Sequence, residues 1–127
     1  MWGVREPLSS YRDLNVWRDG IALVKACYLI TRASPKDELF GLTSQIRRSA
    51  VSVPANIAEG YGRGTRKDYV RHLMIAQGSL KELETHLILA AEVDCAAKAN
   101  LDPILERCDQ LGRGLGALIR ALRAKTD

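Results

Sequence analysis

Residues 65–90 read TRKDYVRHLMIAQGSLKELETHLILA, and this stretch decides the fold. Its apolar side chains recur at alternating steps of four and three residues, the spacing that places them on one face of an α-helix. They are Tyr69, Leu73, Ala76, Leu80, Leu83, Leu87 and Ala90. Thr65, with Asp68 three residues later, is typical of a helix N-terminus. The stretch therefore predicts a long helix that buries one face.

Two segments before this stretch show the same spacing. The first begins with Asp13 as its N-cap and ends at Ser34-Pro35. Its predicted buried line is Leu14, Trp17, Ile21, Val24 and Tyr28. The second begins near Asp37 or Glu38, with a predicted buried line of Leu42, Ile46, Ala50, Val53 and Ile57. Glycine residues end this second helix; they are Gly60, Gly62 and Gly64.

A fourth segment follows, with Asp102 as the expected N-cap and Pro103 as the first helical residue. Its buried line is Ile104, Cys108, Leu111, Leu115, Leu118 and Leu122. Four amphipathic segments with short connections predict an all-α fold, an up-and-down antiparallel four-helix bundle. We expect the bundle to span residues 13–125, after a flexible N-terminal arm of residues 1–12.

The composition agrees with one helical domain in the cytoplasm. The chain has 127 residues, only 6% of them aromatic, and no apolar run approaches the roughly 18 residues of a membrane span. The N-terminal sequence lacks the basic stretch and apolar core of a signal peptide. Cys27, Cys95 and Cys108 are odd in number and widely spaced, which predicts reduced thiols rather than disulfides or a metal site.

The positive charge is concentrated in one segment. The chain has 19 basic and 15 acidic residues, and residues 47–71 alone contain six basic and two acidic ones, which leaves the remainder neutral. The six are Arg47, Arg48, Arg63, Arg66, Lys67 and Arg71. We predict that they contact the phosphates of RNA or DNA. A solvated basic face, or arginines used in ion pairs between subunits, would give the same charge pattern.

The outer side of the second helix lacks the charges that a water-facing helix normally carries. Between Arg48 and Glu59 it holds only small, uncharged side chains. The outward line of residues 65–90 also has an apolar residue and a glycine at its centre. This pattern favours a homo-oligomer that covers these sides. The predicted subunit contacts are Ser52, Pro54, Ala55, Asn56, Glu59, Met74 and Gly78.

No arrangement of residues indicates catalysis. The glycines of residues 60–64 follow a helix and do not match the dinucleotide-binding pattern GxGxxG. His72 and His86 stand roughly 21 Å apart along one helix, too far to share a metal ion. Glu59 is best explained by an ion pair with an arginine. We predict no catalytic residue, no cofactor and no metal; the distant alternative is a hydrolase or metal protein that uses Glu59, Glu82 and His86.

The sequence of residues 39–87 resembles the four-helix bundle family of 23S rRNA intervening-sequence proteins, also called the S23 family. The matching pieces are GLTSQIRRSA (41–50), SVPANIAEG (52–60) and AQGSLKELETHL (76–87), and PANIAEG is a specific signature. Trp17, Tyr28 and Pro35 fall where that family has similar residues. The resemblance covers about residues 11–123.

The resemblance implies a bacterial cytoplasmic bundle that assembles as a homopentamer. Some relatives are encoded in insertions within 23S rRNA genes. Others resemble the accessory protein of diversity-generating retroelements, a basic pentameric barrel that binds nucleic acid and a reverse transcriptase. We therefore predict a non-enzymatic oligomer that binds RNA or DNA phosphates. The alternative is an oligomeric scaffold or adaptor for a protein partner, such as a reverse transcriptase, with no nucleic-acid role of its own.

Overall fold

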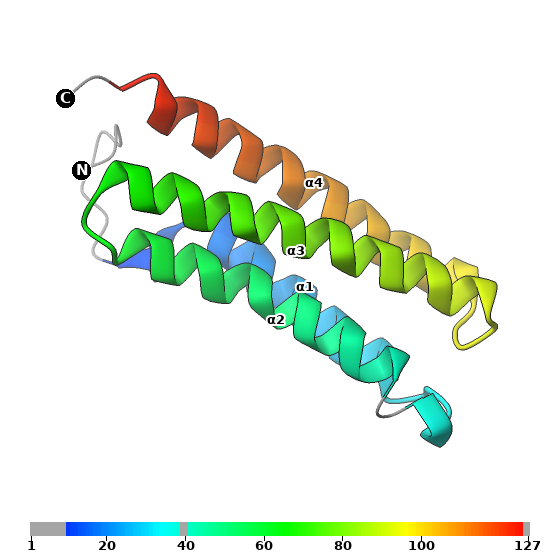
Figure 1. The fold of residues 1–127 in the computed structure, drawn as a ribbon. Helices are drawn as coiled ribbons and strands as arrows, with labels where there is room; N and C mark the ends of the chain where they lie inside the picture. Colours follow the sequence, from blue (N-terminus) through cyan, green and yellow to red (C-terminus); the bar gives the residue numbers. More distant parts are fainter. Residues whose placement is uncertain (1–9, 39–40, 126–127) are drawn as a thin grey trace.

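The computed structural model describes residues 10–38 and 41–125, and within these residues it is entirely helical. Its elements are η1 (Tyr11–Asp13), α1 (Asn15–Thr31), η2 (Lys36–Glu38), α2 (Leu42–Tyr61), α3 (Arg66–Glu92) and α4 (Lys98–Arg123), where η marks a short 3₁₀ helix. Consecutive α-helices run antiparallel, so the α2–α3 connection lies at the same end as the start of α1 and the end of α4 (Figure 1). The predicted all-α four-helix bundle is confirmed.

The beginning of α1 differs from the prediction. The N-cap is Leu14, and Asp13 belongs to η1, whose own cap is the Ser10 hydroxyl, which accepts a hydrogen bond from the Arg12 N–H at 2.9 Å. The Tyr11 ring also packs edge-on against Trp17, with 5.3 Å between ring centroids. Residues 10–12 of the expected arm are therefore part of an ordered turn, and residues 1–9 lie outside the described residues.

The beginnings of α2 and α4 also differ. Asp37 and Glu38 lie in η2, and α2 begins at Leu42, whose N–H donates to Glu38 Oε1 at 3.2 Å. The predicted start of α4 at Asp102 and Pro103 is wrong, because the first helical residue is Lys98, five residues before Pro103. Leu101 is fully buried, and the burial of an apolar side chain outweighs the one helical hydrogen bond that Pro103 removes.

The hydrophobic core confirms three of the four predicted buried lines. All seven apolar residues predicted for α3 are buried, and α2 and α4 follow their predicted lines closely. The line predicted for α1 is wrong, since Ile21 and Tyr28 are 44% and 39% exposed. The buried residues of α1 are instead Gly20, Leu23, Cys27 and Thr31. This helix carries apolar residues on several sides, so its spacing alone does not select the buried face.

Close contacts at glycines explain how the helices pack. A Cβ at Gly20 would lie 3.2 Å from Cβ of Pro54, and α2 continues through this buried proline. A Cβ at Gly60 would lie only 2.7 Å from Cβ of His72. Gly60 was expected to end α2, but it is a helical residue that lets α3 approach. The helix ends at Tyr61 and is capped by Gly62, whose N–H bonds to carbonyls of the last turn.

The three cysteines are free thiols. Cys27 and Cys108 lie in the core, where burial raises the pKa of each thiol to about 12. Within the described part of the chain, none of the helices combines the length and the hydropathy needed to cross a membrane.

Candidate nucleic-acid interface

The six predicted phosphate contacts do not form one patch. Arg63, Arg66, Lys67 and Arg71 lie at the α2–α3 connection, whereas Arg47 and Arg48 lie near the start of α2. From residue 47 to residue 63 an α-helix rises about 24 Å. The prediction of a single basic surface is therefore wrong for Arg47 and Arg48, because α2 carries these two residues away from the other four.

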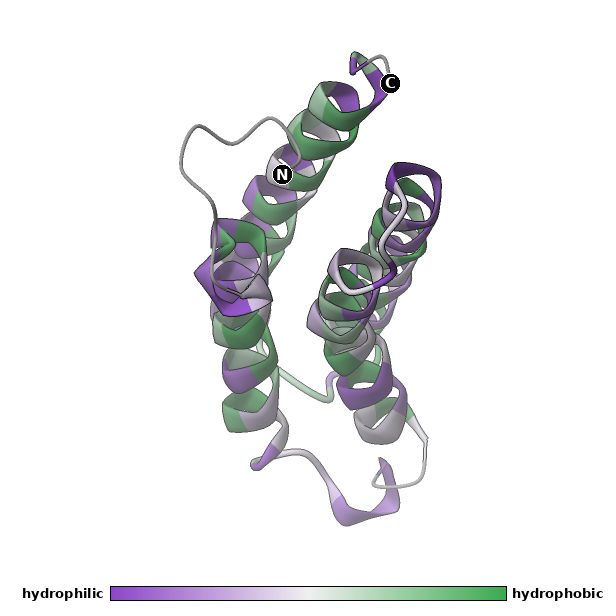
Figure 2. Ribbon diagram, turned by 90° about the vertical axis from the view of Figure 1, so that its left-hand side faces the viewer, coloured by the Kyte–Doolittle hydropathy of each residue, from purple (hydrophilic) through white to green (hydrophobic). Residues whose placement is uncertain are grey.

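Other basic residues join the four at the α2–α3 connection. The antiparallel topology brings the start of α1 and the end of α4 to this place (Figure 1), and Figure 2 views the molecule from this side. We call this surface the basic end; its cations are Arg12, Arg18, Arg63, Arg66, Lys67, Arg71, Arg120, Arg123 and Lys125. Five of these nine cations were not among the predicted phosphate contacts. The predicted antiparallel topology, combined with the charges at the helix ends, would have identified them.

The charge balance separates the basic end from the rest of the protein. Its nine cations are accompanied by four carboxylates, which gives a net charge of +5. The carboxylates are Asp13, Asp19, Glu59 and Asp68. The remaining described residues carry nine basic and nine acidic side chains. The excess positive charge of the described chain therefore lies at this one end, where it produces a positive potential.

The start of α3 and the end of α4 form a shallow basic groove. Arg66 Nη1 donates to the carbonyl of Lys125 at 2.6 Å, which ties the two helices together. The groove has a volume of about 370 Å³ and is lined by Arg66, Lys67, Val70, Leu122 and Arg123. Thr65 caps α3, with its Oγ1 accepting the Asp68 N–H at 3.2 Å. An anion in this groove would meet two exposed cations and the positive end of the α3 dipole.

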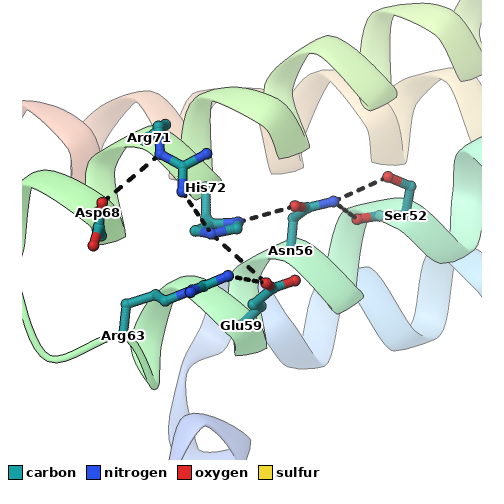
Figure 3. Close-up of polar contacts among 7 residues, drawn as sticks. All are labelled: Ser52, Asn56, Glu59, Arg63, Asp68, Arg71 and His72. Atoms are coloured by element: carbon teal, nitrogen blue, oxygen red, sulfur yellow. Dashed lines mark hydrogen bonds and ion pairs between the residues drawn. The ribbon is translucent and has the colours of Figure 1, made fainter.

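A polar network joins α2 to α3 beside the basic end (Figure 3). Asn56 Nδ2 donates to the Ser52 carbonyl at 2.8 Å, so Asn56 Oδ1 is the acceptor that faces His72 Nδ1 at 3.2 Å. His72 therefore carries its proton on Nδ1, and in the neutral imidazole Nε2 accepts from Arg71 Nη2 at 3.4 Å. The Ser52 hydroxyl also pairs with that of Ser79 at 2.7 Å. The network fixes the register of α2 against α3.

Glu59 has the arginine partner that the sequence predicted. Its Oε2 lies 2.5 Å from Arg63 Nη2 and 3.8 Å from His72 Nε2 (Figure 3). The hydrogen bond from Arg63, with smaller contributions from the charges of His72 and Arg71, lowers the pKa of the Glu59 carboxyl. The pair joins the last turn of α2 to the α2–α3 connection and offsets one of the nine cations.

The predicted subunit contacts have different places in the structure. Pro54 is buried against Gly20 of the same chain, so the prediction that it meets another subunit is wrong. Ser52 and Asn56 are half-buried and use their polar groups within the chain. The predicted residues that remain exposed are Ala55, Glu59, Met74 and Gly78.

Ile75 is a further exposed apolar side chain on α3. It was not among the predicted subunit contacts. Met74 and Gly78 line a groove of about 530 Å³ between α3 and α4. Arg123 Nη2 lies 3.1 Å from the Met74 sulfur at one end of α4. The exposed sides of α3 are therefore apolar both toward α2 and toward α4.

The residues of the distant hydrolase or metal alternative do not assemble into a site. His86 Nε2 lies 3.4 Å from Glu82 Oε2, which is the predicted contact one helical turn apart. Glu59 lies beside His72, at 3.8 Å from its Nε2, and His72 stands roughly 21 Å along α3 from His86. Among residues 10–38 and 41–125, no group of three or more metal-ligating side chains is close enough to hold an ion.

A family model of the 23S rRNA-intervening sequence proteins matches residues 12–117. The chain belongs to this family. Its fold is similar to the crystal structure of a protein of unknown function from the S23 ribosomal protein family of Bacteroides thetaiotaomicron. The TM-score is 0.75 at 24% identity, over 83% of this chain and 95% of that one. No curated protein matches the chain. The predicted family membership is confirmed, and the relation to retroelement accessory proteins stays a prediction.

Proposed function

We propose that this S23-family protein is a non-enzymatic, oligomeric bundle that binds the phosphate backbone of RNA or DNA through its basic end. The observation that carries the proposal is the concentration of nine cations against four carboxylates at one end of an otherwise neutral chain. Cations spread over the ends of all four helices can contact several phosphates at once. Each contact releases condensed counterions, which favours binding at low salt.

The aromatic residues near the basic end support recognition of the backbone rather than of bases. Tyr69 is buried, and Tyr61 packs edge-on against it with 5.9 Å between ring centroids. Tyr11 and Trp17, at the start of α1, are half-buried and pack edge-on against each other. These four rings pack within the chain rather than stack on unpaired bases, which is the usual source of affinity for single strands. We therefore expect binding that depends little on base sequence.

The titratable groups at the basic end and farther along α3 are used in structural contacts. Glu59 pairs with Arg63, and His72 is buried in the network with Asn56. Glu82 and His86 contact each other on the surface of α3. These pairings support a binding role rather than general acid–base chemistry.

The direct test is fluorescence anisotropy with a labelled duplex of about 20 base pairs, titrated with the full chain between about 50 and 200 mM salt. We expect log Kd to rise steeply with log salt, with a slope of about 4 or more if four or five phosphates are contacted. Scrambling the base sequence should leave Kd nearly unchanged. Absence of binding at the lowest salt, or binding insensitive to salt, would contradict the proposal.

The proposed oligomer uses the outer face of α2 and α3. Ala55 and Ile75 lie at the same level, because the Ser52–Ser79 and Asn56–His72 contacts bracket both. Both are exposed, and Ile75 is 42% exposed. A second copy that covers this face would remove apolar surface from water.

Light scattering tests the oligomer. A homopentamer, which the family resemblance implies, has five times the 14.1 kDa chain mass. We expect Ile75→Glu to lower the measured mass, because it places a charge in the covered face. Ile88→Glu is the matched control, since Ile88 is also exposed on α3 but, at 3.6 residues per turn, lies on a different side of the helix from Ile75. A wild-type mass of one chain would contradict the proposed assembly.

A further inference from the structure

Arg47 and Arg48 lie outside the basic end, beside a groove between α1 and α2. The groove has a volume of about 630 Å³, and its lining includes Tyr28, Ser44, Arg47, Arg48, Val51 and Ser52. None of the described residues that line it is acidic. We call it the arginine groove.

The Arg47 side chain is held in a fixed orientation. Its guanidinium carbon lies 4.5 Å from the centroid of the Tyr28 ring, and its Nε donates to Thr31 Oγ1 at 2.9 Å. The Thr31 hydroxyl is itself buried and donates to the Cys27 carbonyl at 2.6 Å. Two contacts to α1 therefore orient the guanidinium before any ligand arrives, which reduces the entropy cost of binding.

Neither arginine has an acidic partner among the described residues. Arg47 is half-buried and Arg48 is exposed, and none of the ion pairs among residues 10–38 and 41–125 involves either of them. A partly buried cation is stabilised by a carboxylate or phosphate that shares its hydrogen bonds. Since Nε of Arg47 is occupied by Thr31, its two terminal nitrogens remain for such a group.

The surroundings favour a carboxylate on a protein over a nucleic acid. Outside the basic end the described residues carry equal numbers of acidic and basic side chains, so no extended positive field attracts a polyanion. Val51 and Tyr28 expose apolar surface in the groove, at 42% and 39%. A peptide segment with an acidic residue next to an apolar one matches both features, because one side chain meets the arginines and the other covers Val51.

We propose that the arginine groove binds an acidic–apolar segment of a different protein. The carboxylate of an Asp or Glu accepts hydrogen bonds from the terminal nitrogens of Arg47, with Arg48 beside it. The neighbouring apolar side chain packs on Val51 and the edge of Tyr28. The site is independent of the proposed nucleic-acid contact, which lies at the other end of α2.

The experiment is a selection of displayed random peptides on the full chain, followed by affinity measurements with a labelled peptide from the most enriched clone. We expect enriched peptides to contain Asp or Glu next to Leu, Ile, Val or Phe. Replacing that acidic residue with its amide should weaken binding about tenfold, which is the effect of losing a charged hydrogen bond. Selections that enrich no peptide, or peptides without acidic residues, overturn the proposal.

Variants of the chain identify the site. Arg47→Lys keeps the charge but loses the planar guanidinium and its stacking, and we expect it to weaken the peptide about tenfold. Arg48→Gln, at an exposed position, should also weaken it. Lys67→Gln at the basic end should leave the peptide affinity unchanged. Unchanged affinity in both arginine variants, with circular dichroism showing folded protein, overturns the proposal.

Light scattering of the same variants separates a foreign partner from a second copy of the chain. We expect Arg47→Lys and Arg48→Gln to keep the wild-type molar mass. A lower mass in either variant would show that another copy fills the groove, which also overturns the proposal.

Discussion

The basic end and the arginine groove both present arginine side chains, yet their surroundings differ. At the basic end the cations outnumber the carboxylates by nine to four and come from the start of α1, the α2–α3 connection, the start of α3 and the end of α4. Outside the basic end the charges of the described residues balance, and in the arginine groove Arg47 is fixed by Tyr28 and Thr31. An excess of spread charge suits a chain of phosphates, whereas one oriented guanidinium suits a single acidic group. Basic residues that are close in sequence can therefore serve different partners.

The largest expected effect comes from removing charge at the basic end. The triple variant Lys67→Gln, Arg120→Gln, Arg123→Gln should weaken duplex binding by about 10- to 100-fold and reduce the salt slope by about three. The matched triple variant Lys81→Gln, Arg107→Gln, Arg113→Gln removes the same charge from exposed positions elsewhere. It should change Kd by less than about threefold. Equal losses in the two triple variants would mean that net charge, and not its position, controls binding.

A second prediction concerns the packing that holds the basic end together. Gly60→Ala would place a Cβ 2.7 Å from His72 Cβ, and we expect it to lower the free energy of unfolding by about 1–3 kcal/mol. Gly78→Ala is the control, because no atom lies within 4 Å of its added Cβ. That variant should be stabilised by up to about 1 kcal/mol through its higher helix propensity. Urea unfolding of both variants measures the difference, and equal stability would contradict the close α2–α3 contact.

The polar network between α2 and α3 gives a third, comparable effect. Asn56→Ala leaves His72 Nδ1 without its acceptor in a buried position, which should cost about 1–3 kcal/mol of stability. The control Thr85→Ala removes an exposed hydroxyl that bonds only to the Lys81 carbonyl of its own helix. We expect this control to change stability by less than about 0.5 kcal/mol. Thermal unfolding that ranks the two variants in the opposite order would contradict a structural role for the network.

The smallest effect is expected from Glu59, which is exposed. Arg63 lowers the pKa of this carboxyl in the folded state. The pair therefore stabilises the fold at pH values above the pKa that Glu59 has in the unfolded chain. That contribution is lost as the pH falls through the lower folded-state value. Glu59→Gln and Arg63→Gln should therefore flatten the dependence of stability on pH in the acidic range by similar amounts. A curve identical to wild type in either variant would show that the ion pair contributes nothing.

The sequence predicted the buried face best where one apolar line runs unbroken along the helix. In α3 every predicted buried position is buried, because that line continues through the whole helix, although other apolar side chains such as Ile75 and Ile88 are exposed. In α1, apolar residues such as Ile21 and Tyr28 compete with Leu23 and Cys27, and the contact of Gly20 with Pro54 selects the buried face. That contact joins two helices, so the spacing within one helix could not predict it.

The candidate site was predicted only in part, for a geometric reason. Residues 47–71 contain six cations in one run of sequence, but the helical rise separates Arg47 and Arg48 from the rest. Conversely, Arg120 and Arg123 are distant in sequence and reach the basic end because α4 runs antiparallel to α3. The Tyr28–Arg47 contact depends on which face of α1 is buried, and the spacing of apolar residues predicted the wrong face.

Hydrogen–deuterium exchange of the full chain with and without the duplex tests most directly where nucleic acid binds. We expect the strongest protection in peptides that cover residues 62–71 and 118–125, with little change in residues 42–52. Protection centred on residues 42–52, or spread evenly along the helices, would contradict the assignment of phosphate binding to the basic end.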